Sequence, residues 1–154
     1  MVYAVVRIRG SINTKPDIKH TLRLLRLTRV NHCVLVEENN YYKGMLQVVK
    51  DYTTWGEINK ETLSKLIRTR GRLIGDKELT EEYIKASTPY DSFNALSQAI
   101  IENKFKYREI PDVKPLFRLN PPRKGYKSTK KSFREGGSLG YRGEEINKLL
   151  ERMI

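Results

Sequence analysis

The sequence predicts an α+β fold, in which a small strand–helix–strand–helix–strand core precedes a helical and basic C-terminal extension. Over residues 1–58, runs of β-branched residues alternate with segments of helical apolar periodicity. Further helical patterns follow, and residues 114–142 then hold nine Lys/Arg and one acid. At 154 residues the chain suits one domain with an extension, and it is long enough to bury a core.

Residues 1–58 are expected to form a sheet with both helices packed on one of its faces. Apolar residues at helical spacing, Ile18, Leu22 and Leu25 in the first helix and Met45, Val48 and Val49 in the second, predict the sides that face the sheet. A polar turn at Glu38–Tyr42 precedes the second helix. The expected strands are Val2–Arg9, Cys33–Glu37 and Tyr52–Ile58, and the expected helices are Asp17–Leu27, opened by Pro16 behind a cap at Thr14 or Lys15, and Gly44–Asp51.

The chain beyond residue 58 is predicted to be mainly helical up to residue 113. Asn59 is the expected cap of a helix over Lys60–Arg70, Thr80 that of a short helix with acids in its first turn, and Ser92 that of a helix over Phe93–Asn103. A terminal helix over Glu144–Met153 has an apolar side that needs a surface to cover. We therefore expect residues 143–154 to pack on the body, which makes residues 114–142 a tethered loop.

Residues 114–142 carry a net charge of +8 out of +12 for the whole chain. Three prolines and four glycines exclude a long helix or broad sheet there. So few of these residues are apolar that we expect Leu119–Gly140 to be mobile until a polyanion neutralises it. Aromatic residues between the charges favour RNA over a solvated tail without a partner. Phe133 either stacks on a base or packs on the body near Leu149.

The candidate RNA-binding residues are arginines and lysines. Arginine forms bidentate hydrogen bonds with phosphates, and both residue types release counterions when they bind RNA. Outside the basic segment they lie at the end of the first strand, on and after the first helix, in the following turn, and around Gly71. The full set is Arg7, Arg9, Arg23, Arg26, Arg29, Lys43, Arg68, Arg70, Arg72, Arg118, Arg123, Lys124, Lys127, Lys130, Lys131, Arg134 and Arg142. A charged face of this kind is also typical of a solvated helix side.

No residue pattern predicts a catalytic centre, a metal site, a cofactor or a small-molecule substrate. His20 and His32 are too far apart for a helical pair, and the glycines near Ser138 lack the ending of a phosphate-binding loop. Cys33 alternates with apolar residues, which predicts a buried thiol. As the only cysteine it excludes an intrachain disulfide, and no run of about 20 apolar residues predicts a membrane span. We expect a cytoplasmic protein that does not bind membranes.

Two regions resemble a family of ribosomal proteins. VVRIRGSIN, KHTLRLLRLTRVNHCVLVEENN and YYKGML resemble the core of the large-subunit ribosomal protein thirty family, and FRLNPPRKGYK with FREGGSLGYRGEEINKLLERMI resembles the ending of its archaeal and eukaryotic forms. The eukaryotic relative is known as large-subunit protein seven. The chain lacks the basic arm that precedes the eukaryotic core, which favours the archaeal form. The resemblance implies a three-stranded antiparallel sheet, as a relative of the ferredoxin-like arrangement.

The resemblance also implies a non-catalytic component of the large ribosomal subunit. Its expected partners are large-subunit rRNA and neighbouring large-subunit ribosomal proteins. The alternative is an RNA-processing or RNA-chaperone factor that binds pre-rRNA transiently through the same surface. An RNA-modifying enzyme is a third class, for which no residues were found.

Overall fold

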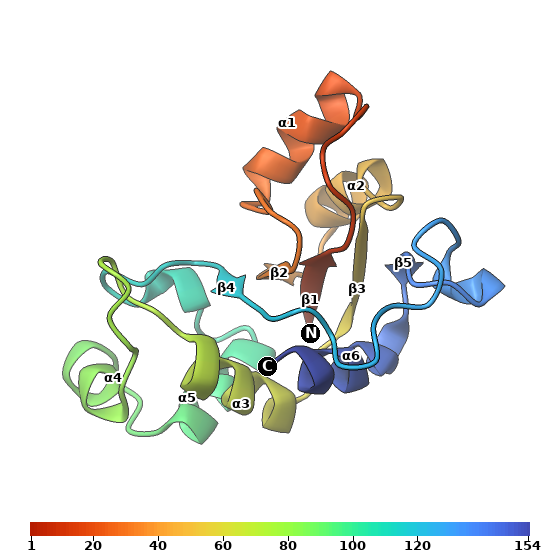
Figure 1. Ribbon diagram of the computed structural model, residues 1–154. Coiled ribbons are helices and arrows are strands. Elements are labelled where there is room, and N and C mark those ends of the chain that lie inside the picture. Colours follow the sequence, from red (N-terminus) through yellow and green to blue (C-terminus); the bar gives the residue numbers. More distant parts are fainter.

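A five-stranded sheet runs through the molecule, whose computed structural model describes residues 1–154 (Figure 1). The strand order is β4-β2-β1-β3-β5, and every neighbouring pair is antiparallel except β3 and β5. The three central strands form the antiparallel core that the resemblance implied, whereas the two short outer strands were not predicted. The strands are β1 (Val2–Arg7), β2 (His32–Glu37), β3 (Thr53–Glu57), β4 (Phe117–Arg118) and β5 (Gly140–Tyr141).

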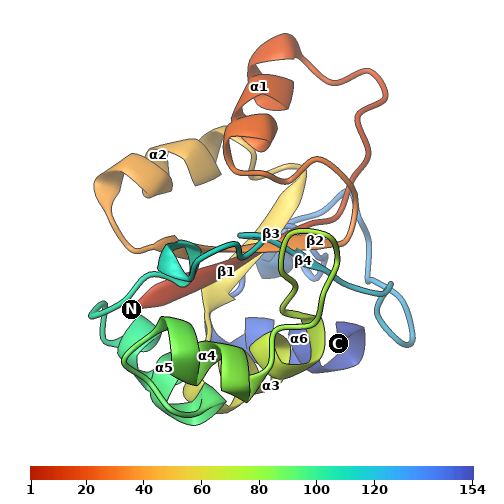
Figure 2. The same cartoon turned by 90° about the vertical axis from the view of Figure 1, so that its left-hand side faces the viewer.

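Helices cover both faces of this sheet (Figure 2). The two helices of the N-terminal core, α1 and α2, share one face as predicted, and helices that follow residue 58 lie on the other. The helices are α1 (Pro16–Leu24), α2 (Asn40–Val48), α3 (Lys60–Arg70), α4 (Glu81–Ser87), α5 (Phe93–Ile101) and α6 (Ile146–Met153), with 3-10 turns at Tyr107–Glu109, Phe133–Glu135 and Gly143–Glu145.

Two apolar clusters result, because β1 is buried on both sides along its whole length. Alternate side chains of a strand point to opposite faces, so Tyr3 and Val5 pack under α1 and α2, while Val2, Ala4 and Val6 join α3, α5 and α6. The cluster that contains Val2, Ala4 and Val6 is the larger of the two. The helices after residue 58 are therefore a required cover for this face of the sheet.

Helix caps were predicted well where a polar side chain precedes an apolar pattern. Asn59 accepts a hydrogen bond from the Thr62 amide at 2.8 Å, and α3 has the predicted bounds. Thr80 and Ser92 cap α4 and α5 in the same way. For α1, Pro16 begins the helix as predicted, but Lys15 makes no side-chain cap hydrogen bond.

Several predicted bounds were wrong. Helix α2 begins at Asn40 within the predicted turn, because Asn39 caps it by accepting from the Tyr42 amide at 2.8 Å. Leu46 packs against the strand residues in place of Val48, which is 46% exposed, contrary to the prediction. Helix α1 ends at Leu24, since Arg26 has a left-handed φ of 62°.

The basic segment is anchored at both ends, whereas the sequence predicted too little apolar area for this. Phe117 is fully buried within β4, and Leu119 and Leu139 are 8% and 4% exposed. Between them the chain bonds to itself: the Phe133 amide donates to Leu139 O at 2.7 Å. A Cβ on Gly137 would lie 2.1 Å from Lys131 O, so the backbone is closely packed there. The expectation of mobility is therefore restricted to the exposed residues between these anchors.

Replacing Leu22 by alanine should destabilise the fold by about 2–5 kcal/mol, because Leu22 is buried among the strand residues under α1. Urea unfolding of the purified protein measures the change. Leu24→Ala is the matched control on the same helix, since its side chain is 54% exposed and should change the unfolding free energy by less than about 0.5 kcal/mol. A loss for Leu22→Ala no larger than that of the control would mean that α1 docks through another side.

Candidate nucleic-acid interface

Asn31, in the connection between α1 and β2, joins the basic segment to the sheet. Its amide donates to Arg7 O at 2.8 Å, and its carbonyl accepts from the Leu119 amide at 3.1 Å. The Tyr126 hydroxyl donates to Asn31 Oδ1 at 2.8 Å. These bonds hold the start of the basic segment beside the end of β1. The aromatic Tyr126 is half-buried here and not free to stack on a base.

A hollow of about 430 Å³ lies between the basic segment and α6. Five basic side chains line it and only one acid, Glu145, does so, which makes it strongly electropositive. Phe133 supplies an aromatic ring to the same wall. The basic residues that line it are Lys124, Lys127, Arg142, Lys148 and Arg152.

Arg142 supports this hollow from inside the protein. Its Nε donates to Thr54 Oγ1 at 2.8 Å and its Nη2 donates to Ser138 O at 2.7 Å. The guanidinium also lies over the Phe133 ring, 5.1 Å from its centre. Burial lowers the pKa of Arg142 to about 10, but this value is still well above 7, and the guanidinium remains charged at neutral pH. Phe133 is thus half-buried against a neighbouring side chain, which favours the packing alternative.

Most other predicted residues of the basic segment are free on its surface. They are exposed, and none of them forms an ion pair within the chain. Charges of this kind gain most when a polyanion approaches, because nothing in the protein neutralises them. These residues are Arg123, Lys124, Lys127, Lys130, Lys131 and Arg134.

Three predicted arginines surround His32 at the start of β2. Burial lowers the pKa of His32, and the charges of Arg118, Arg29 and Arg7 lower it further. The side chain is 9% exposed, and its Nδ1 has no hydrogen-bond partner. His32 is therefore neutral at pH 7. Sequence reasoning did not place a histidine in this cluster, because β4 brings Arg118 to it from far along the chain.

Arg7 lies inside the protein, where each of its three guanidinium nitrogens donates a hydrogen bond. It is 3% exposed and donates to Arg9 O at 2.9 Å, Leu27 O at 2.8 Å and Ser11 Oγ at 2.6 Å. Arg72 likewise donates to Thr69 O and Gly71 O. Arg9 donates to Asp51 O at 3.3 Å and lies over the Tyr52 ring. These arginines fix turns of the backbone.

The remaining predicted residues lie outside the hollow. Arg23, Arg26 and Arg29 are exposed on and after α1, which stands apart from α6 (Figure 1). Lys43 faces Glu38 at 3.6 Å, and Arg118 faces Asp76 at 3.1 Å. Arg68 lies over the Phe93 ring, and Arg70 is half-buried with an unpartnered Nε. The structure therefore does not unite all the predicted residues in one site.

Two residues of the hollow, Lys148 and Arg152, were missed from the sequence. Residues 143–154 have a net negative charge, which hid them. The signal was their i, i+4 spacing on the side of α6 opposite Leu149 and Leu150. Arg152 Nη1 also donates to Arg123 O at 3.2 Å, which ties the segment to this helix.

Other chemistry is not supported by the side chains. Cys33 is fully buried as predicted, and burial raises the pKa of its thiol to about 12. No three His, Cys, Asp or Glu side chains are grouped so that they could hold a metal ion. None of the helices has both the length and the apolar character to span a bilayer.

The family model for ribosomal protein L30p/L7e matches residues 3–53, which is the region from β1 to the start of β3. Full-length relatives extend the match. The large ribosomal subunit protein uL30 of Methanosphaera stadtmanae is 55% identical over 153 residues, which cover 99% of this chain and 100% of the relative. The chain belongs to this family. The proteins of the same name from Methanocella arvoryzae and Methanoregula boonei are 51% and 52% identical, again over 99% of each chain.

The resemblance found in the sequence is thereby confirmed, including its archaeal form. The relatives match over the whole length and not only over the family core. The basic segment and α6, which build the hollow, are therefore part of what this chain shares with archaeal uL30 proteins.

The stability of the protein should fall as the pH is lowered from 7 to 5, partly through His32. Its pKa is lowered in the folded state, so the unfolded chain, with a histidine pKa of about 6.5, binds more protons in this range. The contribution of His32 to the free energy of unfolding is therefore fully present above the pKa of the unfolded chain and is lost as the pH falls below it. Urea unfolding at several pH values measures this, and His32→Gln should make the decline shallower. His20→Gln, at an exposed position, is the control; equal slopes for both variants would exclude His32.

Proposed function

We propose that the basic segment and its neighbours bind large-subunit rRNA and that the chain uses them as a structural part of the ribosome. The chain is a non-catalytic component of the large ribosomal subunit, like the proteins that it matches. Its part is to neutralise phosphates where RNA segments come together. The observation that carries this proposal is the row of exposed, unpaired cations beside the electropositive hollow.

Phosphate contacts are assigned to the residues whose charges the protein leaves free. They comprise the exposed residues of the basic segment, with Lys148 from α6, Arg23 and Arg29 near α1, and Arg68 and Arg70 at the end of α3. Lys43 and Arg118 join them once RNA competes with their carboxylate partners, as exposed ion pairs are weak. Arg7, Arg9, Arg72 and Arg142 act mainly by supporting the backbone behind this surface.

Salt washing of large subunits tests whether the association is structural. Subunits that contain a tagged copy of the chain are sedimented through a high-salt cushion, and the chain is then quantified against rRNA. A structural component stays at one copy per subunit. Loss of most of the chain, together with its presence on precursor particles, would favour the transient factor.

Lys127→Ala and Lys130→Ala should each weaken RNA binding regardless of RNA sequence. Each removes a phosphate contact, so the slope of log affinity against log salt should fall in magnitude by about 0.9 on duplex RNA and about 0.7 on single strands. Filter binding of the purified protein to fragments of large-subunit rRNA at several salt concentrations measures both. An unchanged slope in both variants would place these lysines away from phosphate.

Arg142→Ala is the matched control, because it removes a positive charge that the fold already uses. It should lower the unfolding free energy, while the protein that remains folded keeps the salt slope of the parent. A lowered slope with unchanged stability would instead assign Arg142 to direct phosphate contact.

A further inference from the structure

The outer edge of β2 is only partly paired. Strand β4 pairs with His32 and Cys33, and no strand lies beside the rest of β2 on that side. Backbone groups of an antiparallel strand alternate in direction. The Glu38 amide donates to Met1 O on the β1 side, so that Leu35 and Glu37 direct their N–H and C=O groups away from β1. An open strand edge of this kind is a template for another extended chain.

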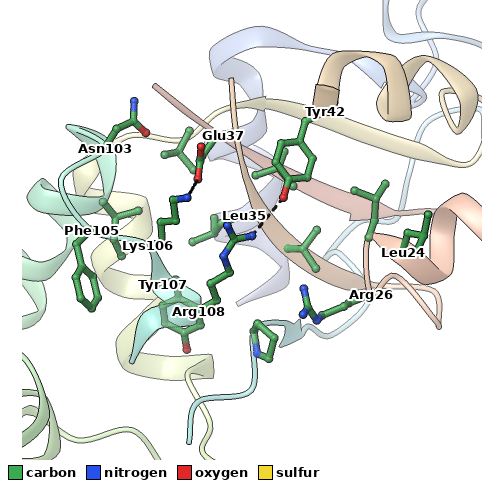
Figure 3. Close-up of a pocket in the computed structure, with 16 residues that line it drawn as sticks. Leu24, Arg26, Leu35, Glu37, Tyr42, Asn103, Phe105, Lys106, Tyr107 and Arg108 are labelled. Carbon is green, nitrogen blue, oxygen red and sulfur yellow. Dashed lines mark hydrogen bonds and ion pairs between the residues drawn. The ribbon is translucent and has the colours of Figure 1, made fainter. Parts of the chain in front are cut away.

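A groove of about 110 Å³ opens along this edge (Figure 3). Its walls are mainly apolar and come from α1, from β2 and from the segment that contains the 3-10 turn at Tyr107. An apolar cavity of about 150 Å³ holds a benzene ring. The groove therefore suits one aliphatic side chain and is too small for a nucleobase. Leu24, Val34, Val36, Phe105 and Pro115 are among its lining residues.

The rim of the groove is positively charged. Lys106 is neutralised by Glu37 at 3.1 Å, whereas Arg108 donates only to the Tyr42 hydroxyl at 3.3 Å (Figure 3). Arg26 is exposed at the other side and forms no ion pair within the chain. Two arginines without carboxylate partners therefore flank an apolar hole beside an open strand edge. An acidic, extended peptide complements all three features.

We propose that the edge of β2 from Val34 to Glu37 docks an extended segment of a neighbouring ribosomal protein. The backbone of this segment pairs with Leu35, and one of its aliphatic side chains occupies the groove. Acidic residues two positions before and after that aliphatic residue lie on the same side of the segment and face Arg26 and Arg108. That the partner is ribosomal rests on the proposed function, whereas the binding chemistry does not. The surface lies on β2 and α1 and is lined by none of the residues of the hollow beside α6.

A photo-crosslinker in assembled subunits identifies the occupant. Leu24 lines the groove yet is 54% exposed, so Leu24→p-benzoylphenylalanine should be tolerated. Irradiation of purified large subunits should join this position to an acidic, extended stretch of another ribosomal protein. Arg108→Glu should reduce the yield several-fold while the chain stays in the subunit. Crosslinks to rRNA alone, to a second copy, or to nothing would overturn the proposal. If the chain is missing from the subunits altogether, the proposed function has failed instead.

Binding by the isolated protein tests the chemistry without the ribosome. The probe is the blocked peptide Asp-Thr-Leu-Thr-Asp, whose leucine and two aspartates share one side of a strand. In NMR titration the Leu35 amide should shift more than that of Val34, and the same peptide with lysines in place of the aspartates should bind several-fold more weakly. Equal binding of both peptides, or shifts confined to other surfaces, would overturn the proposal.

Leu35→Pro removes the outward N–H and leaves the hydrogen bonds to β1 in place, as proline is tolerated at a strand edge. The variant should bind the acidic peptide roughly fivefold more weakly, which corresponds to the loss of one hydrogen bond. Unchanged affinity would refute the backbone pairing. Should this variant fail to fold, Arg108→Glu tests the charge pairing instead: the peptide with lysines should then bind better than the acidic one, and the reverse order would overturn the proposal.

Discussion

The burial of β1 on both faces is the constraint on which the rest of this structure depends. A strand with apolar residues at five consecutive positions, Val2 to Val6, cannot be left with one side in water, since each exposed valine costs about 1.5–3 kcal/mol. Helices α1 and α2 cover only the side that bears Tyr3 and Val5. The other side needs α3, α5 and α6, and the chain can deliver α6 there only by passing the basic segment around the sheet.

This path explains why a strongly basic segment is held in place without being buried. Its apolar residues sit where it joins the sheet, at Phe117 and Leu139, and its charges project between these points. Arg142 and Arg152 then tie it to Thr54 and to the backbone of the segment itself. Positive charge is thus concentrated on a surface whose shape is set by apolar anchors and by arginine hydrogen bonds to neutral acceptors. Such a surface loses little conformational entropy when RNA binds.

Helices α3, α4 and α5 could be predicted from the sequence because their capping signals are local. Asn59, Thr80 and Ser92 cap their helices through side chains that lie within three residues of their partners. The outer strands could not be predicted, since each has two residues and exists only through pairing with distant segments. Among the candidate site residues, charge alone could not separate Arg7, with its three internal acceptors, from Lys127 on the surface. That difference is decided by tertiary contacts.

The hydrogen bond from Thr54 to Gly140 spans 86 residues, and that from the Asn59 amide to Asn147 spans 88. Contacts this distant in sequence form slowly, because the chain must lose the entropy of a long loop before it gains their energy. Pairing of β1 with β2 and β3 needs much shorter loops. The sheet centre should thus form early in folding and the electropositive hollow last. A newly made chain then acquires its attraction for phosphate in an organised form only once its own core is complete, so the shaped RNA surface exists only on chains that have already folded.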